Sequence, residues 1–388
     1  MQTFNPTIQD FINKNINSNA SDLMLKASSY PEWDMKAIVQ QLVGKQIAKK
    51  KLPTWFQNNE VLYPVRLSME QCSSEATAKY KTTIINSGRG IDLTGGFGVD
   101  TIFLSKQSES LIYCERNEDL ASLVNHNFKA LNQHNCEVHV GDGVEYLKNL
   151  KKIDWIYVDP SRRKESQRIY RLEDCEPNVI DLIGLFFDKA ENVLIKTAPL
   201  LDIQQTLRDL KSVKEVHVIA VNNDCKEVLY LLEKDFTGET QIFCVNLKKE
   251  HIEEFRFTLS EEREALNLYS EPLEYIYEAN TAIMKAGAFK SIASKYELYK
   301  LQKNSHLYTS QNFISEFPGR RFKVKEVLNL DKKSLTKLPK KANLACRNYP
   351  HKVEVLKKKL KINDGGNKYI FATTIKEKQL KLIVCEKV

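Results

Sequence analysis

Ile91-Asp92-Leu93-Thr94-Gly95-Gly96-Phe97-Gly98, residues 91–98, carries the strongest structural signal in this chain. A short apolar strand ends at an acid, a glycine-rich turn follows, and a helix begins near Val99. Glycines let the backbone approach a ligand closely and adopt positive φ angles. The first N–H groups of a helix also have no partner inside that helix. Together these features predict a ligand-binding turn between a strand and a helix.

The chain beyond this turn alternates between short apolar strands and helices. This alternation is typical of βαβ units and predicts an α/β fold with a mostly parallel, Rossmann-like sheet. Three closely spaced strands at the end of the region suit an antiparallel edge. The expected strands are 91–93, 111–114, 138–140, 154–158, 193–196, 216–221, 228–232 and 241–247, and the expected helices are 99–106, 120–131, 144–150, 179–190 and 203–210.

Acidic residues recur where the predicted strands end. Glu115 ends the second strand, Asp142 follows the third between two glycines, and Asp159 follows the fourth. The glycines do not match a dinucleotide fingerprint, because Thr101 stands where the third small residue is needed. Asp92 precedes the glycines and can receive the ammonium group of a bound amino acid, which a dinucleotide lacks. Glu115 offers two oxygens to the hydroxyls of a ribose, and Asp142 can accept from an adenine amino group.

Over residues 70–235 these strand-end signals resemble the motifs of class I methyltransferases. The resemblance implies S-adenosylmethionine as the cofactor, with its methionine part at the glycine-rich turn, its ribose at Glu115 and its adenine at Asp142. Each acid taken alone could instead be an ordinary exposed strand-end carboxylate. The expected cofactor-binding residues are Asp92, Thr94, Gly95, Gly96, Gly98, Glu115, Arg116, Asp142, Gly143 and Asp159.

The fourth strand is followed by Asp159-Pro160-Ser161-Arg162-Arg163, which departs from the pattern of related enzymes. Methyltransferases that act on exocyclic amines of bases commonly carry Asp or Asn, two prolines and an aromatic residue here. We expect Asp159 to orient the target N–H, and the arginines to stack on a base or grip a phosphate. The alternative is a salt bridge to Glu165, Glu173 or Asp174. The expected catalytic residues are Asp159, Ser161, Arg162 and Arg163.

Residues 92–100 are also similar to the D-x-T-x-G-x-G-x-D form of certain rRNA guanine-N2 methyltransferases, which likewise carry Glu-Arg after the second strand, here Glu115-Arg116. The layout as a whole resembles bacterial methyltransferases with a C-terminal THUMP-like domain, through the segments 347–351 and 365–366. THUMP domains proper bind RNA, so the resemblance implies an rRNA or tRNA substrate.

The charge distribution favours the same partner. Residues 320–388 carry a formal net charge of +14, although the whole chain carries +8. A basic module on a mildly acidic body is typical of a protein that binds a polyanion. The alternative is a solvated, lysine-rich surface that aids solubility.

Four further residues are candidate substrate contacts. Lys196 ends the fifth strand and faces the same crevice, where it could reach a phosphate or simply cap the sheet. Ser74 and Glu75 precede the first strand, where a helix often folds over the cofactor; an ordinary helix start is the alternative. Arg347 belongs to the THUMP-like segment.

The sequence predicts four regions: a helical region at 1–80, the methyltransferase domain at 81–247, a small α+β subdomain at 248–319 and the basic module at 320–388. No segment reads as a secretion signal or a membrane span. The eight cysteines include no C-x-x-C pair, so we expect reduced thiols, no metal and a cytoplasmic protein. The expected function is methylation of a base, with an exocyclic amine as the favoured target. The alternatives are a methyltransferase for a small molecule or a protein, and a non-catalytic RNA-binding protein that retains the fold.

Overall fold

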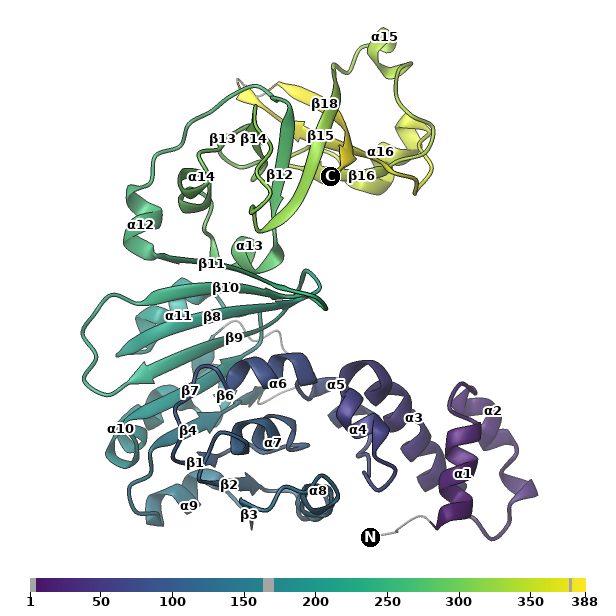
Figure 1. The fold of residues 1–388 in the computed structure, drawn as a ribbon, viewed down its shortest axis with the longest axis vertical. Coiled ribbons are helices and arrows are strands. Elements are labelled where there is room, and N and C mark those ends of the chain that lie inside the picture. The colour runs from purple at the N-terminus through teal and green to yellow at the C-terminus, as the bar shows by residue number, and fades with distance from the viewer. Residues whose placement is uncertain (1–4, 163–170, 377–378) are drawn as a thin grey trace. The chain divides into compact units, whose positions relative to one another are not determined.

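The computed structural model describes residues 5–162, 171–376 and 379–388. It divides into two compact units, which are described separately below. The first unit contains residues 1–214 and 227–238, and the second contains residues 215–226 and 239–388. Figure 1 shows the order of their elements along the chain.

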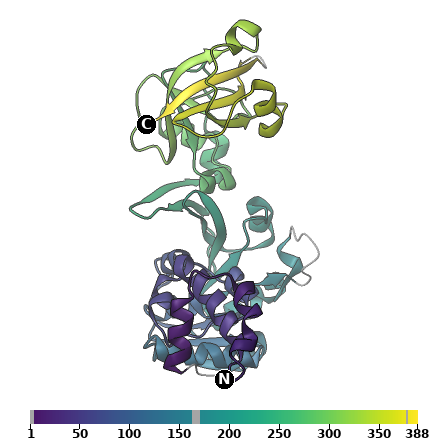
Figure 2. The ribbon, with the colours of Figure 1, turned by 90° about the vertical axis from the view of Figure 1, so that its right-hand side faces the viewer.

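Seven short helical segments open the first unit, and Figure 2 shows the N-terminal helices lying side by side. Polar caps start several of them: the side chains of Asn5, Asn19 and Asp34 each accept a backbone N–H in the first turn. The segments are α1 (Pro6–Lys14), α2 (Ala20–Leu25), η1 (Ala27–Ser29), α3 (Met35–Lys51), α4 (Pro53–Gln57), α5 (Arg66–Gln71) and α6 (Glu75–Lys81).

The sequence predicts helical structure over residues 69–85, with Ser73-Ser74-Glu75 as a local start or a functional turn, and the structure shows the local start. Helix α5 ends at Gln71, and Ser74 starts α6 as its N-cap by accepting the N–H of Thr77. A serine side chain that bonds to the backbone three residues on favours a new helix start over continuation of the old helix. This break places Ser73 between the two helices.

The sheet of the first unit has the strand order β3-β2-β1-β4-β7-β9. The first five strands pair in parallel, and β9 pairs antiparallel with β7. The predicted, mostly parallel sheet is therefore confirmed, and β9 is antiparallel as expected, whereas two other strands of the expected antiparallel edge, residues 213–221 and 241–247, pair with each other in parallel. The order reverses between β1 and β4, which is where open α/β sheets bind ligands. The strands are β1 (Arg89–Asp92), β2 (Ser110–Glu115), β3 (Cys136–Val140), β4 (Trp155–Val158), β7 (Asn192–Thr197) and β9 (Asp224–Glu233).

Helices connect these strands and build the core. Trp55 of α4, Phe103 of α7 and Phe128 of α8 belong to one buried cluster, so the N-terminal helices share a core with those of the sheet domain. The helices are α7 (Val99–Ser105), α8 (Glu118–Ala130), α9 (Gly143–Asn149), α10 (Val179–Lys189) and α11 (Ile203–Asp209). A two-stranded ribbon of β5 (Ser161–Arg162) and β6 (Cys175–Glu176), with η2 (Leu172–Asp174), follows β4.

The second unit contains a seven-stranded sheet of order β13-β14-β12-β15-β18-β17-β16. Its strands are β12 (Tyr275–Ala279), β13 (Tyr299–Lys300), β14 (Tyr308–Ser310), β15 (Gly319–Leu328), β16 (Asn343–Arg347), β17 (Lys368–Thr374) and β18 (Leu380–Lys387). Strand β8 (Val213–Val221), which enters this unit from residue 215, pairs in parallel with β10 (Gln241–Leu247), and β10 pairs antiparallel with β11 (Ile252–Thr258). The helices are α12 (Leu259–Glu264), α13 (Thr281–Ala286), α14 (Ser291–Lys295), α15 (Lys332–Leu335) and α16 (Val353–Leu360).

The sequence predicts a helical stretch over residues 281–301 that is interrupted by Gly287, and a hairpin turn at Gly365-Gly366; the structure confirms the interruption and contradicts the hairpin. Gly287, with φ of 80°, ends α13, so the helical pattern over 281–301 yields two short helices. Gly365 and Gly366 also have positive φ, but they lead from α16 into β17 and form no hairpin. Because β16 and β17 are parallel, the hairpin lies between β17 and β18 instead. Within the described residues, no helix is long and apolar enough to cross a membrane.

Candidate active site

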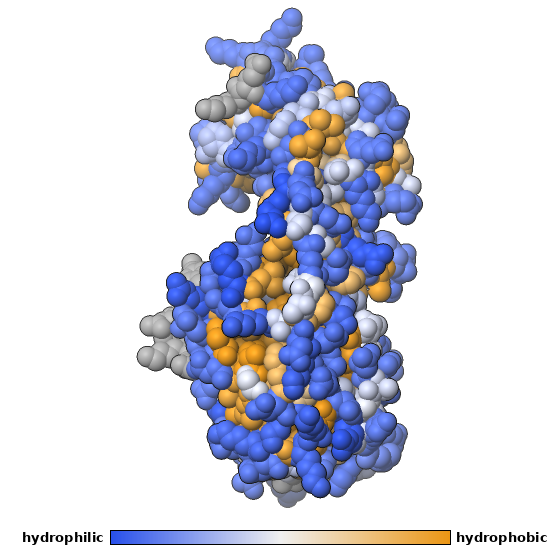
Figure 3. All heavy atoms as spheres, turned by 90° about the vertical axis from the view of Figure 1, so that its left-hand side faces the viewer, coloured by the Kyte–Doolittle hydropathy of each residue, from blue (hydrophilic) through white to orange (hydrophobic). Residues whose placement is uncertain are grey.

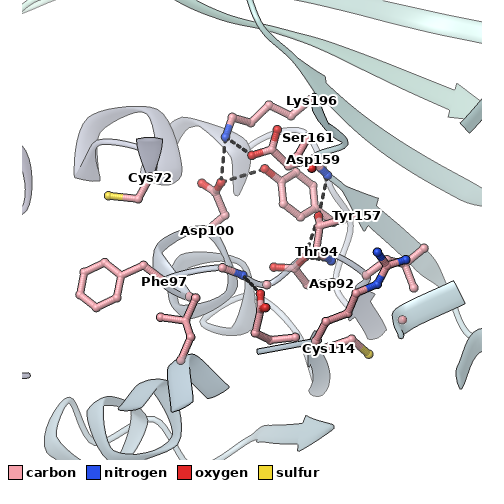
Figure 4. A pocket seen from close by; sticks show the side chains of 18 of the residues that line it. Cys72, Asp92, Thr94, Phe97, Asp100, Cys114, Tyr157, Asp159, Ser161 and Lys196 are labelled. Atoms are coloured by element: carbon pink, nitrogen blue, oxygen red, sulfur yellow. Dashed lines mark hydrogen bonds and ion pairs between the residues drawn. The ribbon is translucent and has the colours of Figure 1, made fainter. Parts of the chain in front are cut away.

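A pocket of about 330 Å³ opens at the carboxyl ends of β1, β2 and β4 in the first unit. This volume lies within the range of small-molecule sites. Figure 4 shows Asp92, Thr94, Asp100, Tyr157, Asp159 and Lys196 around it. Most of the residues predicted for the site line this one pocket: Asp92, Thr94, Gly95, Gly96, Gly98, Glu115, Arg116, Asp142, Gly143, Asp159, Ser161 and Lys196. The structure thus brings these residues together, and their individual roles stay predictions.

Asp92 lies at the base of the pocket with 1% of its surface exposed. One carboxylate oxygen accepts the N–H of Thr94 at 3.0 Å, and the other accepts the hydroxyl of Thr101 at 2.7 Å. Burial raises the pKa of Asp92 to about 7, although both threonines act in the opposite direction. The Asp92 carboxyl group is therefore partly protonated at neutral pH, and a bound cation would favour its ionised form.

The glycine-rich turn leaves open space beside this acid. Gly96 and Gly98 have φ angles of 52° and 72°, a region that favours glycine. A Cβ atom at Gly96 would meet no atom closer than 3.9 Å, so this stretch of backbone borders open space. A Cβ at Gly143 would lie 2.5 Å from the carbonyl oxygen of Leu93, so glycine is needed there for close backbone approach.

The acids of β2 and β3 close one side of the pocket. Glu115 accepts the N–H groups of Gly96 at 3.0 Å and Asn117 at 2.8 Å. Asp142 caps α9 through one oxygen, and its other oxygen lies 2.5 Å from Arg116 Nη2. Arg116 also contacts Glu176 of β6 at 2.6 Å. Arg116 therefore connects the end of β2 to the β5–β6 ribbon.

The opposite side contains Asp159 and Lys196. The backbone N–H of Asp159 donates to the hydroxyl of Thr94 at 2.7 Å, which fixes the residue above the glycine-rich turn. The ammonium group of Lys196 forms an ion pair with Oδ2 of Asp159. Ser161 is exposed on β5, and its hydroxyl donates to the carbonyl of Glu176 at 3.4 Å.

Other predicted residues lie elsewhere or outside the description. Ser74 serves as the cap of α6, and Glu75 accepts from Thr54 and pairs with Lys79, so these two are not among the pocket-lining residues. Arg347 belongs to the second unit, where it pairs with Glu278. The side chain of Arg162, as well as Arg163 and Glu165, lies outside the described residues. Glu173, one proposed partner of the arginines, pairs with Arg171.

The structure adds charged residues that the sequence-based interpretation missed. Asp100 lines the pocket, and Lys81 and Glu227 are buried next to it. Asp100 belongs to the glycine-rich motif and could have been noticed there. Lys81 and Glu227 carry no local signal, because their pairing joins α6 to a strand far along the chain.

The pocket carries an excess of negative charge. Among the described residues that line it, six carry a carboxyl group (Asp92, Asp100, Glu115, Asp142, Asp159 and Glu176) and two carry a cation (Arg116 and Lys196). An anionic pyrophosphate would be repelled by such a wall, whereas a ligand with cationic groups would be attracted. The charges of the described lining residues therefore suit a cationic ligand better than an anionic one.

Comparison with known proteins agrees with the class that this fold and pocket define, the class I methyltransferases. Residues 319–387 match a family model described as THUMP domain-like, and residues 275–318 match one described as a ferredoxin-like domain. A crystal structure from Porphyromonas gingivalis W83, described as a "putative methyltransferase", is 34% identical with a TM-score of 0.89, and the match covers 100% of both chains. The chain therefore belongs to this family of methyltransferases with a C-terminal THUMP-like domain.

Other matches are partial. An rRNA methylase from Streptococcus thermophilus is 17% identical over 41% of this chain and 93% of its own, with a TM-score of 0.29. TrmK from M. capricolum, solved with S-adenosylhomocysteine, is 14% identical over 41% of this chain and 68% of its own, with a TM-score of 0.33. These likenesses are too low to support an argument. No curated protein matches the chain.

Proposed function

We propose that this protein transfers a methyl group from S-adenosylmethionine to a base of rRNA or tRNA, with an exocyclic amine as the target. The observation that carries the proposal is the set of six acidic residues among the described residues that line a glycine-bordered pocket at the switch point of the sheet. S-adenosylmethionine carries a cationic sulfur and an ammonium group, so its charge complements this pocket.

The residues of the pocket suit the parts of this cofactor. Asp92 would receive the ammonium group, Glu115 the ribose hydroxyls, and Asp142 with Gly143 the adenine. A carboxylate offers about four lone-pair positions, so Glu115 can accept hydroxyls in addition to its two backbone N–H groups. When bound, S-adenosylmethionine supplies an activated methyl group on a positively charged sulfur.

Asp159 is the group that would orient the target amine. Its carboxylate lies at the pocket and can accept an N–H bond from the amine, which aligns the nitrogen lone pair. With the cofactor bound, the nitrogen lone pair would form the new N–C bond as the methyl–sulfur bond breaks, and the sulfur would keep that electron pair. The nitrogen then loses one proton, for which the Asp159 carboxylate is an acceptor within reach.

The basic module supports RNA as the substrate. Residues 320–388 have a formal net charge of +14. Among the described residues of this module, fourteen lysines are exposed: Lys323, Lys325, Lys332, Lys333, Lys337, Lys340, Lys341, Lys352, Lys358, Lys359, Lys361, Lys368, Lys376 and Lys387. Figure 3 shows hydrophilic side chains over most of the face that it draws of the second unit. Lysines of this density favour the phosphate backbone of a nucleic acid.

A labelling experiment tests the proposal. Purified full-length protein is incubated with methyl-tritiated S-adenosylmethionine and total RNA from cells that lack the protein. We expect label in the RNA and an N-methylated base after nucleoside mass spectrometry. Label confined to protein or to small molecules would contradict the RNA assignment, and an absence of cofactor binding would contradict the enzyme assignment.

Cofactor binding should also depend on pH through Asp92. Its pKa of about 7 means that the ionised form, which receives an ammonium group, becomes populated as the pH rises. Between pH 5.5 and 7 we expect the affinity for S-adenosylmethionine to rise by up to about tenfold per pH unit. Calorimetry at several pH values measures this, and Asp92→Asn should bind more weakly with a flat profile. A flat profile for the unaltered protein would exclude Asp92 as the ammonium acceptor.

A further inference from the structure

A chain of charged side chains lies behind the pocket and begins at Lys81. This lysine, on α6, is fully buried with 0% of its surface exposed. Its Nζ lies 3.0 Å from Asp100 Oδ1 of α7 and 2.6 Å from Glu227 Oε1 of β9. Buried charges persist only when they are paired. These three residues therefore form a fixed group that joins two helices to the sheet.

Asp100 extends this group towards the pocket. Its Oδ2 accepts the hydroxyls of Ser73 at 2.7 Å and Tyr157 at 2.8 Å, and lies 3.8 Å from Lys196 Nζ. Burial alone would raise the pKa of Asp100, but Lys81, Lys196 and the two hydroxyls lower it to about 2. Asp100 is thus an anion with a single orientation, and Figure 4 shows Lys196 between Asp100 and Asp159.

Lys196 connects the fixed Asp100 carboxylate to Asp159 in the pocket. Its side chain is 12% exposed, and its ammonium group pairs with Oδ2 of Asp159, whose side chain is 36% exposed. Within the described part of the chain, Oδ1 of Asp159 has no hydrogen bond. One carboxylate oxygen is therefore held by the protein, and the other is left for a ligand.

We infer that Lys196 is a positioning residue, which fixes the Asp159 carboxylate through the buried group of Lys81, Asp100 and Glu227. The inference rests on the proposed function and deepens it. An anionic acceptor held by a cation suits a neutral target that bears an N–H, and it disfavours a carboxylate or phosphate as the methyl acceptor.

Two variants of Lys196 test the inference, with methyl transfer to RNA and calorimetric binding of S-adenosylmethionine as measurements. Lys196→Met should lower kcat by about 30-fold or more, because misplacement of an orienting group by about 1 Å can cost 100-fold. Its Kd for the cofactor should change less than about threefold, and Lys196→Arg, which keeps the cation, should recover most of kcat. Glu227→Gln, which alters the buried group and not the pocket lining, should lower kcat by about three- to tenfold.

The matched control is Lys211→Met, since Lys211 is exposed and does not line the pocket. Denaturant unfolding checks that each variant is folded. If Lys196→Met keeps its kcat, or if Lys196→Arg is as impaired as Lys196→Met, the positioning role is wrong while the proposed function stands. If the unaltered protein transfers no methyl group to RNA, the proposed function fails and the inference falls with it.

Discussion

Replacement of Asp159 by alanine is expected to lower kcat for methyl transfer by about 100-fold or more, because it removes the acceptor that aligns the target amine. The cofactor should still bind, since the Gly96–Gly98 turn and the acids of β1, β2 and β3 are unchanged. Single-turnover methylation of RNA measures the rate, and calorimetry measures the Kd for S-adenosylmethionine, which should change less than about threefold.

Asp188→Ala is the matched control, because Asp188 is an exposed aspartate of α10 that does not line the pocket. Its kcat should equal that of the unaltered protein. A Kd that rises in parallel with the loss of kcat would place Asp159 among the cofactor contacts instead. The orienting role would then be wrong.

The strand-end acids could be predicted from the sequence because their signal is local. Asp92, Glu115, Asp142 and Asp159 each follow an apolar strand, and parallel strands present their carboxyl ends at the same edge of the sheet. The strand topology therefore places these four residues, which are far apart in the sequence, around one pocket. The same reasoning located Lys196 at the end of β7, without showing which group it contacts.

The buried group could not be predicted, because its contacts join segments far apart in the chain. Lys81 reads as a solvated lysine at the end of a helix, and Glu227 reads as the polar start of a strand. Only the packing of α6 against α7 and the antiparallel placement of β9 bring them to Asp100. The antiparallel direction of β9 beside β7 thus determines that Glu227 is the acid of this strand that pairs with Lys81.

The glycine pair at residues 365–366 shows how a local sequence signal can predict the wrong strand connection. Gly365 and Gly366 have the composition of a hairpin turn, yet the neighbouring strands β16 and β17 are parallel and are connected through α16. The pairing of strands is set by the whole sheet, and a glycine pair fixes only the local backbone. For the same reason Ser74 could be recognised as a helix start but its distance from the pocket could not.

The buried group makes a second strong prediction, which concerns stability. Lys81→Met leaves Asp100 and Glu227 buried without their common cation. Removal of one partner from a buried ion pair costs about 3–5 kcal/mol, so the free energy of unfolding in denaturant should fall by that amount. Lys148→Met is the control: the side chains of Lys148 and its partner Glu145 are 50% and 66% exposed, and the expected cost is about 0–1 kcal/mol.

A second substitution separates lost pairing from lost packing. If the cost of Lys81→Met comes from unpaired carboxylates, Glu227→Gln should be less harmful in the Lys81→Met background than in the unaltered protein, because it removes one of the two stranded charges. The two costs should differ by about 1 kcal/mol or more in a double-mutant cycle. Additive costs would mean that Lys81 and Glu227 do not interact in the folded protein, and Glu227 would then have no part in the buried group.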